Sequence, residues 1–209
     1  MINQIINVND NETGKLEIFV SDLHRQSASN WINKNISGKE MIIGFHPGSA
    51  LLKNHIHKRW DKNKFAELGN ILISKYNASI LLFGNEFELN EEIKSKLNGN
   101  ALIASDSDFM NSISRMEHCN LFVTNDTAFL HSAAALNIPT VAIFGYTNHK
   151  ELLPWKSKHV VVRKDFDCSP CFYNSPKPAE CIYKGEDEFK CIKLISVGDV
   201  YQSIKELLL

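Results

Sequence analysis

The sequence lacks three features that would point directly to a partner: a surplus of charge, a long apolar run and a glycine-rich phosphate fingerprint. In its 209 residues, 23 lysines and arginines stand against 24 aspartates and glutamates, so the net charge of -1 gives no reason to expect a nucleic acid as partner. No apolar run approaches the ~20 residues of a membrane span, and no basic start leads into an apolar core. We therefore expect a cytoplasmic chain without a transmembrane segment. The missing G-x-G-x-x-G motif disfavours a dinucleotide-dependent oxidoreductase.

Cysteines are also few, and their spacing leaves two interpretations open. The cytosol keeps thiols reduced, so the five cysteines are expected to be thiols or metal ligands rather than a disulfide framework. Cys168, Cys171, Cys181 and Cys191 have the ligand count of a Cys-four zinc site, and the first pair has its C-x-x-C spacing. The single cysteines that follow are less typical of such a site. A structural zinc ion and four unligated cysteines are the alternatives, and Cys119 is expected in the core.

From Met41 onward, short apolar runs alternate with amphipathic segments. This alternation predicts an α/β fold, a parallel sheet with helices on both faces, in which ligands bind at the carboxyl ends of strands. We expect strands at 41–46, 79–84, 101–104, 121–124, 140–144 and near 159–162, with helices at 62–76, 88–97, 108–118, 127–136 and 197–208. A polar tail, a short strand at 16–20 and a helix after Ser21 are expected to precede them.

The segment 121–131 is the most informative, because an apolar strand leads through a polar turn into a helix. The first N–H groups of a helix have no intrahelical partner, so an anion is favoured there. Asn125 or Asp126 is expected to cap this helix, and Thr127 and His131, four residues apart, are expected on one face. A capped helix with a solvated histidine is the alternative.

Other strand ends add polar groups to the same edge. The turn after the first strand contains Gly48, which allows close approach to a ligand, and Ser49, which can donate to an anion. Lys58 precedes a helix for which Asp61 is the expected N-cap, and it could bind a phosphate or be merely solvated. After the second strand, an acidic side chain could accept both hydroxyls of a ribose.

Four motifs together resemble the ADP-heptose:lipopolysaccharide heptosyltransferases, glycosyltransferase family 9. They are His46-Pro-Gly-Ser49, Lys58-Arg-Trp60, the run from Asn125 to Leu136, and Phe144-Gly-Tyr-Thr147. The cysteine segment is also similar to one found in many of these proteins. The resemblance implies the C-terminal half of a GT-B glycosyltransferase, a Rossmann-like domain over residues 41–209 with a cysteine-containing loop at 165–192. Residues 1–40 would then be a tail and the remnant of the interdomain connection.

Residue by residue, the resemblance implies that Ser49 and Lys58 contact the diphosphate and that Glu88 binds the ribose. Asp126 would hold sugar hydroxyls, with Lys58 and Asp126 as the catalytic pair. Thr127 and neighbouring N–H groups would bind the diphosphate, with Gly48, Ala128 and His131 close to it. Two positions depart from the family, since Ala128 stands where many members have glycine and Tyr146 replaces a common proline.

The implied function is donor binding for an inverting glycosyltransferase of lipopolysaccharide or surface polysaccharide assembly, with an ADP-heptose-like sugar as donor. The acceptor domain, with its lipid-linked saccharide and general base, is expected to be missing from this chain, which would then be an incomplete enzyme. The alternative is a non-catalytic nucleotide-sugar-binding module. No cofactor is expected for the transfer itself, and the chain would be cytoplasmic or peripheral at the inner membrane.

Overall fold

The computed structural model describes residues 14–38, 40–172 and 176–208. Its centre is a six-stranded sheet in which every pair is parallel, in the order β3-β2-β1-β4-β5-β6. The strands are β1 (Met41–His46), β2 (Ala78–Leu82), β3 (Ala101–Ile103), β4 (Leu121–Asn125), β5 (Thr140–Ile143) and β6 (His159–Val162). This order is that of the Rossmann fold, so the predicted fold class is confirmed. The two edge strands, β3 and β6, are the shortest together with β5.

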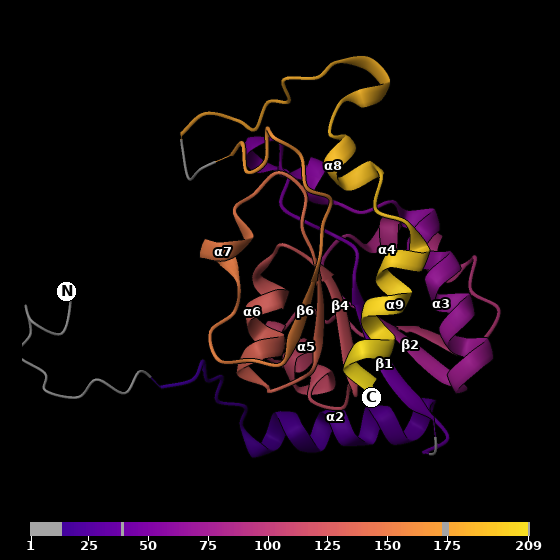
Figure 1. The fold of residues 1–209 in the computed structure, drawn as a ribbon. Helices are drawn as coiled ribbons and strands as arrows, with labels where there is room; N and C mark the ends of the chain where they lie inside the picture. The colour runs from indigo at the N-terminus through magenta and orange to yellow at the C-terminus, as the bar shows by residue number, and fades with distance from the viewer. Residues whose placement is uncertain (1–13, 39, 173–175, 209) are drawn as a thin grey trace, which may run out of the picture.

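Helices cover both faces of this sheet (Figure 1). On one face lie α3 (Lys62–Tyr76), α4 (Phe87–Lys94) and α9 (Val197–Leu208). On the other lie α2 (Asp22–Asn35), α5 (Phe109–Met116) and α6 (Ala128–Ala135). Shorter helices belong to the connections: η1 (Leu52–Lys58), α7 (His149–Leu152), η2 (Gly185–Asp187) and α8 (Lys190–Lys193).

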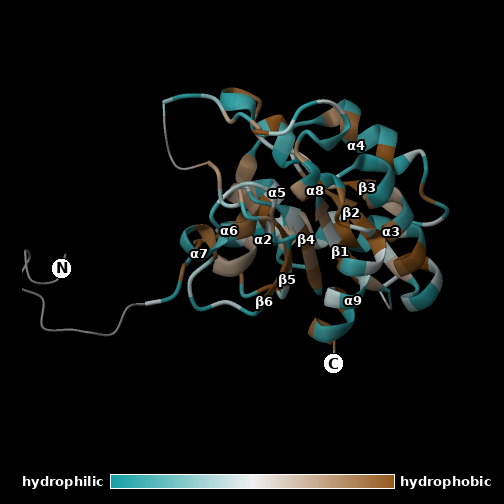
Figure 2. Ribbon diagram, turned by 45° about the horizontal axis from the view of Figure 1, so that its top comes forward, coloured by the Kyte–Doolittle hydropathy of each residue, from teal (hydrophilic) through white to brown (hydrophobic). Residues whose placement is uncertain are grey.

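The inner strands β1, β2, β4 and β5 are mostly apolar because both of their faces are buried, as the brown sheet between teal-and-brown helices in Figure 2 illustrates. In β1, Phe45 packs with α3 and α9, whereas Ile42 packs with α2 and α5. In β4, Val123 packs on the same face as Phe45, and Phe122 packs on the same face as Ile42. This period-two division fixes the register of each strand, and with it the heights at which the strands end.

The expected boundaries agree with the structure to within about three residues, and α3 and α9 match at both ends. Asp61 caps α3 by accepting from the N–H groups of Asn63 and Lys64, and Ser21 caps α2. The strand expected at 16–20 is wrong, because these residues lie in no strand and only Val20 is buried. A strand needs a neighbour to pair its backbone groups, and this segment runs along the surface into α2.

Helix α2 packs closely on α5 and contributes Ile32 to the core of its face. The domain boundary expected after residue 40 stays a prediction. None of the helices in residues 14–38, 40–172 and 176–208 is long and apolar enough to cross a bilayer.

The chain reverses its direction of winding between β1 and β4, which are neighbours in the sheet although two strands separate them in sequence. Open α/β sheets have their ligand crevice at the carboxyl ends of the strands at such a point. Figure 1 shows η1 and the segment around α8 above this edge of the sheet.

Candidate functional site

A cleft of about 580 Å³ opens at this edge of the sheet. Its walls come from the connection after β1, the turn after β2, the start of α5 and the start of α6. The volume lies within the range of small-molecule sites in proteins. Of the sequence-predicted residues, the cleft brings together Ser49, Lys58, Asp126, Thr127 and Ala128.

Asn125, at the end of β4, ties the walls of the cleft together. Its amide nitrogen donates to the carbonyl oxygens of Pro47 (2.9 Å) and Gly48 (3.1 Å), and its Oδ1 accepts from the N–H of Trp60 (3.0 Å). The side chain is fully buried, so no water replaces these bonds. The β1–α3 connection is therefore held to β4 at both of its ends.

The start of α6 faces the cleft, but its expected capping is wrong. Thr127 occupies the N-cap position, and no side chain caps the helix. Asn125 is committed to the β1–α3 connection and Asp126 to Lys58, so neither is available. Thr127 turns its hydroxyl toward His46 Nδ1, at 3.0 Å, and Ala128 is the first helical residue at the cleft. An uncapped helix start with its partial positive charge is suited to an anion.

Lys58 and Asp126 form an ion pair across the mouth of the cleft. Lys58 Nζ lies 2.7 Å from Asp126 Oδ2, and both side chains are largely buried. The pair comes from two loops that sequence separates by 68 residues. An ammonium group has three N–H donors, so one bond to Asp126 leaves others for a ligand.

A guanidinium and a carboxylate, those of Arg59 and Glu86, also line the cleft. Arg59 donates to the carbonyl oxygen of Ser49 (2.6 Å) and to Glu86 Oε1 (3.2 Å). Ser49 donates its hydroxyl to the carbonyl oxygen of His55 (2.7 Å). A Cβ at position 48 would collide with the Glu86 carboxylate, so Gly48 is buried beneath that carboxylate and stays outside the cleft lining. Gly84, at φ 105°, supplies the turn that brings Glu86 over it.

His46 forms part of the floor of the cleft. Its ring is 4% exposed and stacks on Phe129, with 4.3 Å between ring centroids. Burial, with the nearby positive charge of Arg59, lowers the pKa of His46 to about 3. The imidazole is therefore neutral near pH 7 and acts there as a hydrogen-bonding and packing group.

Two predicted residues lie away from the cleft. Glu88 is exposed on α4 and lines a neighbouring hollow, whereas Glu86, two residues earlier, lines the cleft itself. His131 is exposed on α6 and is not among the lining residues. The i,i+4 argument does not hold for it, because Thr127 precedes the helix with φ −149°.

Sequence reasoning assigned no role to several lining residues, among them Arg59, His55 and Phe109, and of the two neighbouring glutamates it chose Glu88 over Glu86. Arg59 and Glu86 were visible only as members of polar turns, and their pairing is a contact between two loops. Phe109, 49% exposed at the start of α5, has no sequence signal either, because its exposure is known only from the structure and single exposed apolar residues are common.

The cysteine-bearing loop lies beside the cleft. Cys168, Cys171, Cys181 and Cys191 line one small cavity together with Tyr146 and Phe189, and all four are free thiols. Burial and the neighbouring thiols raise the pKa of Cys171 and Cys191, the latter to about 11. Within the described ranges, no group of three or more histidine, cysteine, aspartate or glutamate side chains is arranged to hold a metal ion. The zinc site therefore stays a prediction.

Comparison with known proteins gives a consistent result. The model of glycosyltransferase family 9 (heptosyltransferase) matches residues 2–182. The lipooligosaccharide heptosyltransferase 2 of Campylobacter jejuni (serotype O:6) is 30% identical over 179 residues, which cover 82% of this chain and 52% of that protein. This chain thus spans about half the length of the Campylobacter jejuni relatives.

Two solved structures share the fold. The Escherichia coli ADP-heptose LPS heptosyltransferase II has a TM-score of 0.70 at 23% identity, covering 97% of this chain and 56% of that one. A family 9 glycosyltransferase from Veillonella parvula has a TM-score of 0.76 at 21% identity, covering 99% and 58%.

The tie made by Asn125 can be tested with Asn125→Asp. The substitution keeps the shape but turns an acceptor oxygen toward two carbonyl oxygens, so we expect the free energy of unfolding to fall by about 3 kcal/mol. Urea denaturation measures this. Asn70→Asp is the control, because Asn70 makes similar bonds to Lys96 and Asn98 at a half-exposed position and should lose less than about 1 kcal/mol. Equal losses in the two variants would contradict the argument.

The zinc prediction is tested by elemental analysis of protein purified under reducing conditions. If the four thiols converge on a metal, about one zinc per chain is expected, lost on replacing Cys168 and Cys171 by serine. A zinc content near zero, with all four thiols open to titration, would leave them as unligated cysteines.

Proposed function

This chain belongs to glycosyltransferase family 9, and on that premise we propose that it binds the nucleotide-sugar donor of a heptosyltransferase in lipopolysaccharide assembly. The observation that carries the proposal is the cleft at the β1/β4 edge, where the uncapped start of α6 and the Lys58 ammonium face the same space. Both are features that attract a diphosphate. The relatives' names as heptosyltransferases, and the ADP-heptose in the name of the E. coli enzyme, support ADP-heptose as the donor.

The proposed division of the cleft follows its chemistry. The diphosphate lies at the start of α6, where Thr127 and Ala128 meet Lys58. The ribose lies beside Glu86, and the base rests on the apolar wall formed by Leu51 and Phe109. Asp126, held by Lys58, reaches the sugar hydroxyls. This assignment moves the ribose contact from Glu88 to Glu86, because Glu86 lines the cleft.

Heptosyl transfer breaks the anomeric C–O bond and leaves ADP, so negative charge grows on the diphosphate as the bond opens. We propose that Lys58 and the α6 N–H groups meet this charge without the help of a metal ion. Donors fixed before reaction contribute about 3 kcal/mol each to such stabilisation. An inverting reaction then needs an acceptor hydroxyl on the opposite face of the sugar, with a base to take its proton.

The acceptor side of the reaction is proposed to lie on another domain. Since this chain spans about half the length of its relatives, donor binding is the share of the reaction that we assign to it. A lipid-linked saccharide as acceptor would bring the protein to the cytoplasmic face of a membrane as a peripheral protein. A chain that binds ADP but transfers heptose only when a separate acceptor domain is added would support this division.

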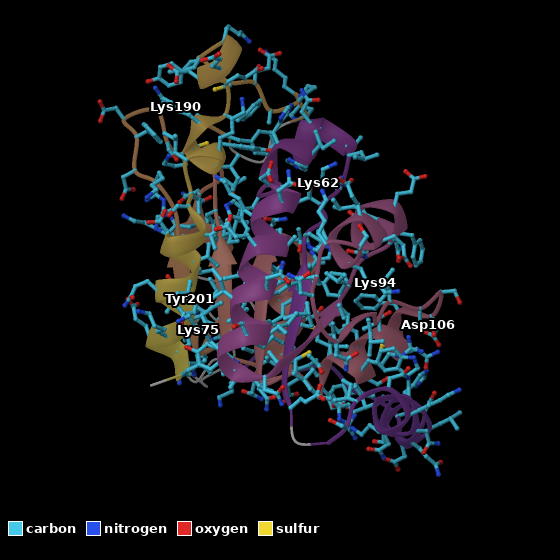
Figure 3. The ribbon with its side chains drawn as sticks, turned by 90° about the vertical axis from the view of Figure 1, so that its right-hand side faces the viewer. Lys62, Lys75, Lys94, Asp106, Lys190 and Tyr201 are labelled. Carbon is cyan, nitrogen blue, oxygen red and sulfur yellow. The ribbon has the colours of Figure 1, made fainter. Side chains whose placement is uncertain are left out.

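Replacing Lys58 by alanine should weaken ADP binding at least tenfold. A hydrogen bond to a charged group is lost, and Asp126 is left as an unpaired negative charge at the diphosphate site. Isothermal titration calorimetry measures the affinity. Lys62→Ala is the control, because Lys62 starts α3 (Figure 3) and pairs with Glu92 away from the cleft. Wild-type affinity in Lys58→Ala would remove this residue from the site.

Glu86→Gln and Glu88→Gln separate the two ribose assignments. If Glu86 accepts the ribose hydroxyls, wild-type protein should prefer ADP to 2′-deoxy-ADP, and Glu86→Gln should reduce this preference severalfold. Glutamine keeps an oxygen for Arg59, so the wall stays in place. If the preference for ADP over 2′-deoxy-ADP is lost only in Glu88→Gln, Glu88 and not Glu86 binds the ribose.

A further inference from the structure

His55 is a cleft residue that the sequence motifs do not include. It belongs to η1, three residues before Lys58, and lines the same space as Lys58 and Asp126. Its carbonyl oxygen accepts from the Ser49 hydroxyl at 2.7 Å, and its ring meets Phe172 edge-on at 5.1 Å between centroids. Both the backbone and the ring of His55 are therefore held in place.

The shape of η1 depends on the cysteine-bearing loop. Lys53 and Asn54 adopt left-handed φ angles of 56° and 60°, which turn the chain just before His55. Ala179 binds both residues, donating to the Lys53 carbonyl oxygen (3.0 Å) and accepting from the Asn54 amide (3.2 Å). His57 stacks on Phe189 of the same loop, with 4.0 Å between centroids.

Tyr146 joins that loop to the histidine. Its ring is 1% exposed and packs against Phe172 and Phe189, with centroids 5.9 Å and 5.4 Å away. Its hydroxyl lies 3.2 Å from His55 Nδ1 and 3.5 Å from the Asn54 carbonyl oxygen.

The contact couples the position of the proton on the His55 ring to the Tyr146 hydroxyl. In one arrangement the Tyr146 hydroxyl donates to an unprotonated Nδ1, and a neutral imidazole then has its hydrogen on Nε2. In the other, a protonated Nδ1 donates to the hydroxyl, which donates in turn to the Asn54 carbonyl oxygen. In the part of the chain that the structure describes, Nε2 makes no hydrogen bond. Burial, together with the positive charges of Lys58 and Lys53 and against the effect of Asp126, lowers the pKa of His55. In the first arrangement the neutral ring presents an N–H donor in the same cleft as the Lys58 ammonium.

We propose that His55 donates a hydrogen bond from Nε2 to the donor's diphosphate, and that Tyr146 is the positioning residue that fixes this donor. The inference rests on the proposed function, because it names a further contact of the same site. The cysteine-bearing loop then has a role in binding, because its Phe172 and Phe189 hold the Tyr146 ring, whose hydroxyl contacts His55 in the cleft.

Calorimetry with ADP and adenosine tests the contact. His55→Ala should weaken ADP binding about tenfold and leave adenosine, which has no phosphate, within twofold of wild type. His55→Gln should recover part of the loss, because its amide can donate. His159→Gln is the control, since His159 starts β6 at the opposite edge of the sheet. Unchanged ADP affinity in His55→Ala would overturn the inference, whereas a wild-type chain that does not bind ADP would overturn the proposed function itself.

The positioning role has a spectroscopic test in the wild-type chain. The ¹⁵N chemical shifts of the His55 ring should show a hydrogen on Nε2 and an unprotonated Nδ1 at pH 7.5. Tyr146→Phe keeps the packed ring but removes the hydroxyl, so the tautomer preference should be lost and ADP affinity should fall severalfold. Tyr201→Phe is the matched control, because the Tyr201 hydroxyl contacts Tyr76 and Tyr201 lies well below Lys190 in Figure 3, outside the residues that line the cleft. A hydrogen on Nδ1 in the wild type would overturn the role of Tyr146.

Discussion

The cleft depends on one buried amide. The connection from β1 to α3 carries Ser49, His55, Lys58 and Arg59, and Asn125 binds it near its start and again at Trp60. Trp60 is itself fixed from the other side, because its indole N–H donates to the Ile195 carbonyl oxygen at 2.9 Å. A connection held at both ends can present its polar groups at fixed positions, and such prior order lowers the entropy cost of binding. The uncharged Asn125 side chain therefore fixes the backbone from which the charged groups of the site project.

Much of this arrangement follows from the sequence alone. Continuous apolar runs such as 80–83 and 141–144 are typical of parallel strands covered on both faces, and Asp61 marks the start of α3. The carboxyl ends of parallel strands lie at the same edge of the sheet. Residues that follow different strands are therefore expected to lie close together in space. Lys58 and Asp126 meet there at 2.7 Å, and no local sequence pattern predicts that they form an ion pair.

The remainder could not be predicted because it depends on contacts between loops. Choosing between Glu86 and Glu88 requires the backbone turn at Gly84 and the partner Arg59, and neither has a periodic pattern. His131 was placed by helix periodicity, which begins only at Ala128. The path from Phe189 through Tyr146 to His55 joins three connections, each unremarkable in sequence. Local patterns specify elements, whereas the details of a site arise where irregular segments touch.

The short strands at the two borders of the sheet have a consequence for how the protein behaves at high concentration. β3 has three residues and β6 has four, so each border offers few unpaired backbone groups to a strand from another molecule. Aggregation by edge-to-edge pairing of strands from different copies is therefore disfavoured, even though the inner strands are mostly apolar. The sheet can keep a largely hydrophobic interior because its outermost strands are too short to act as templates for strand addition.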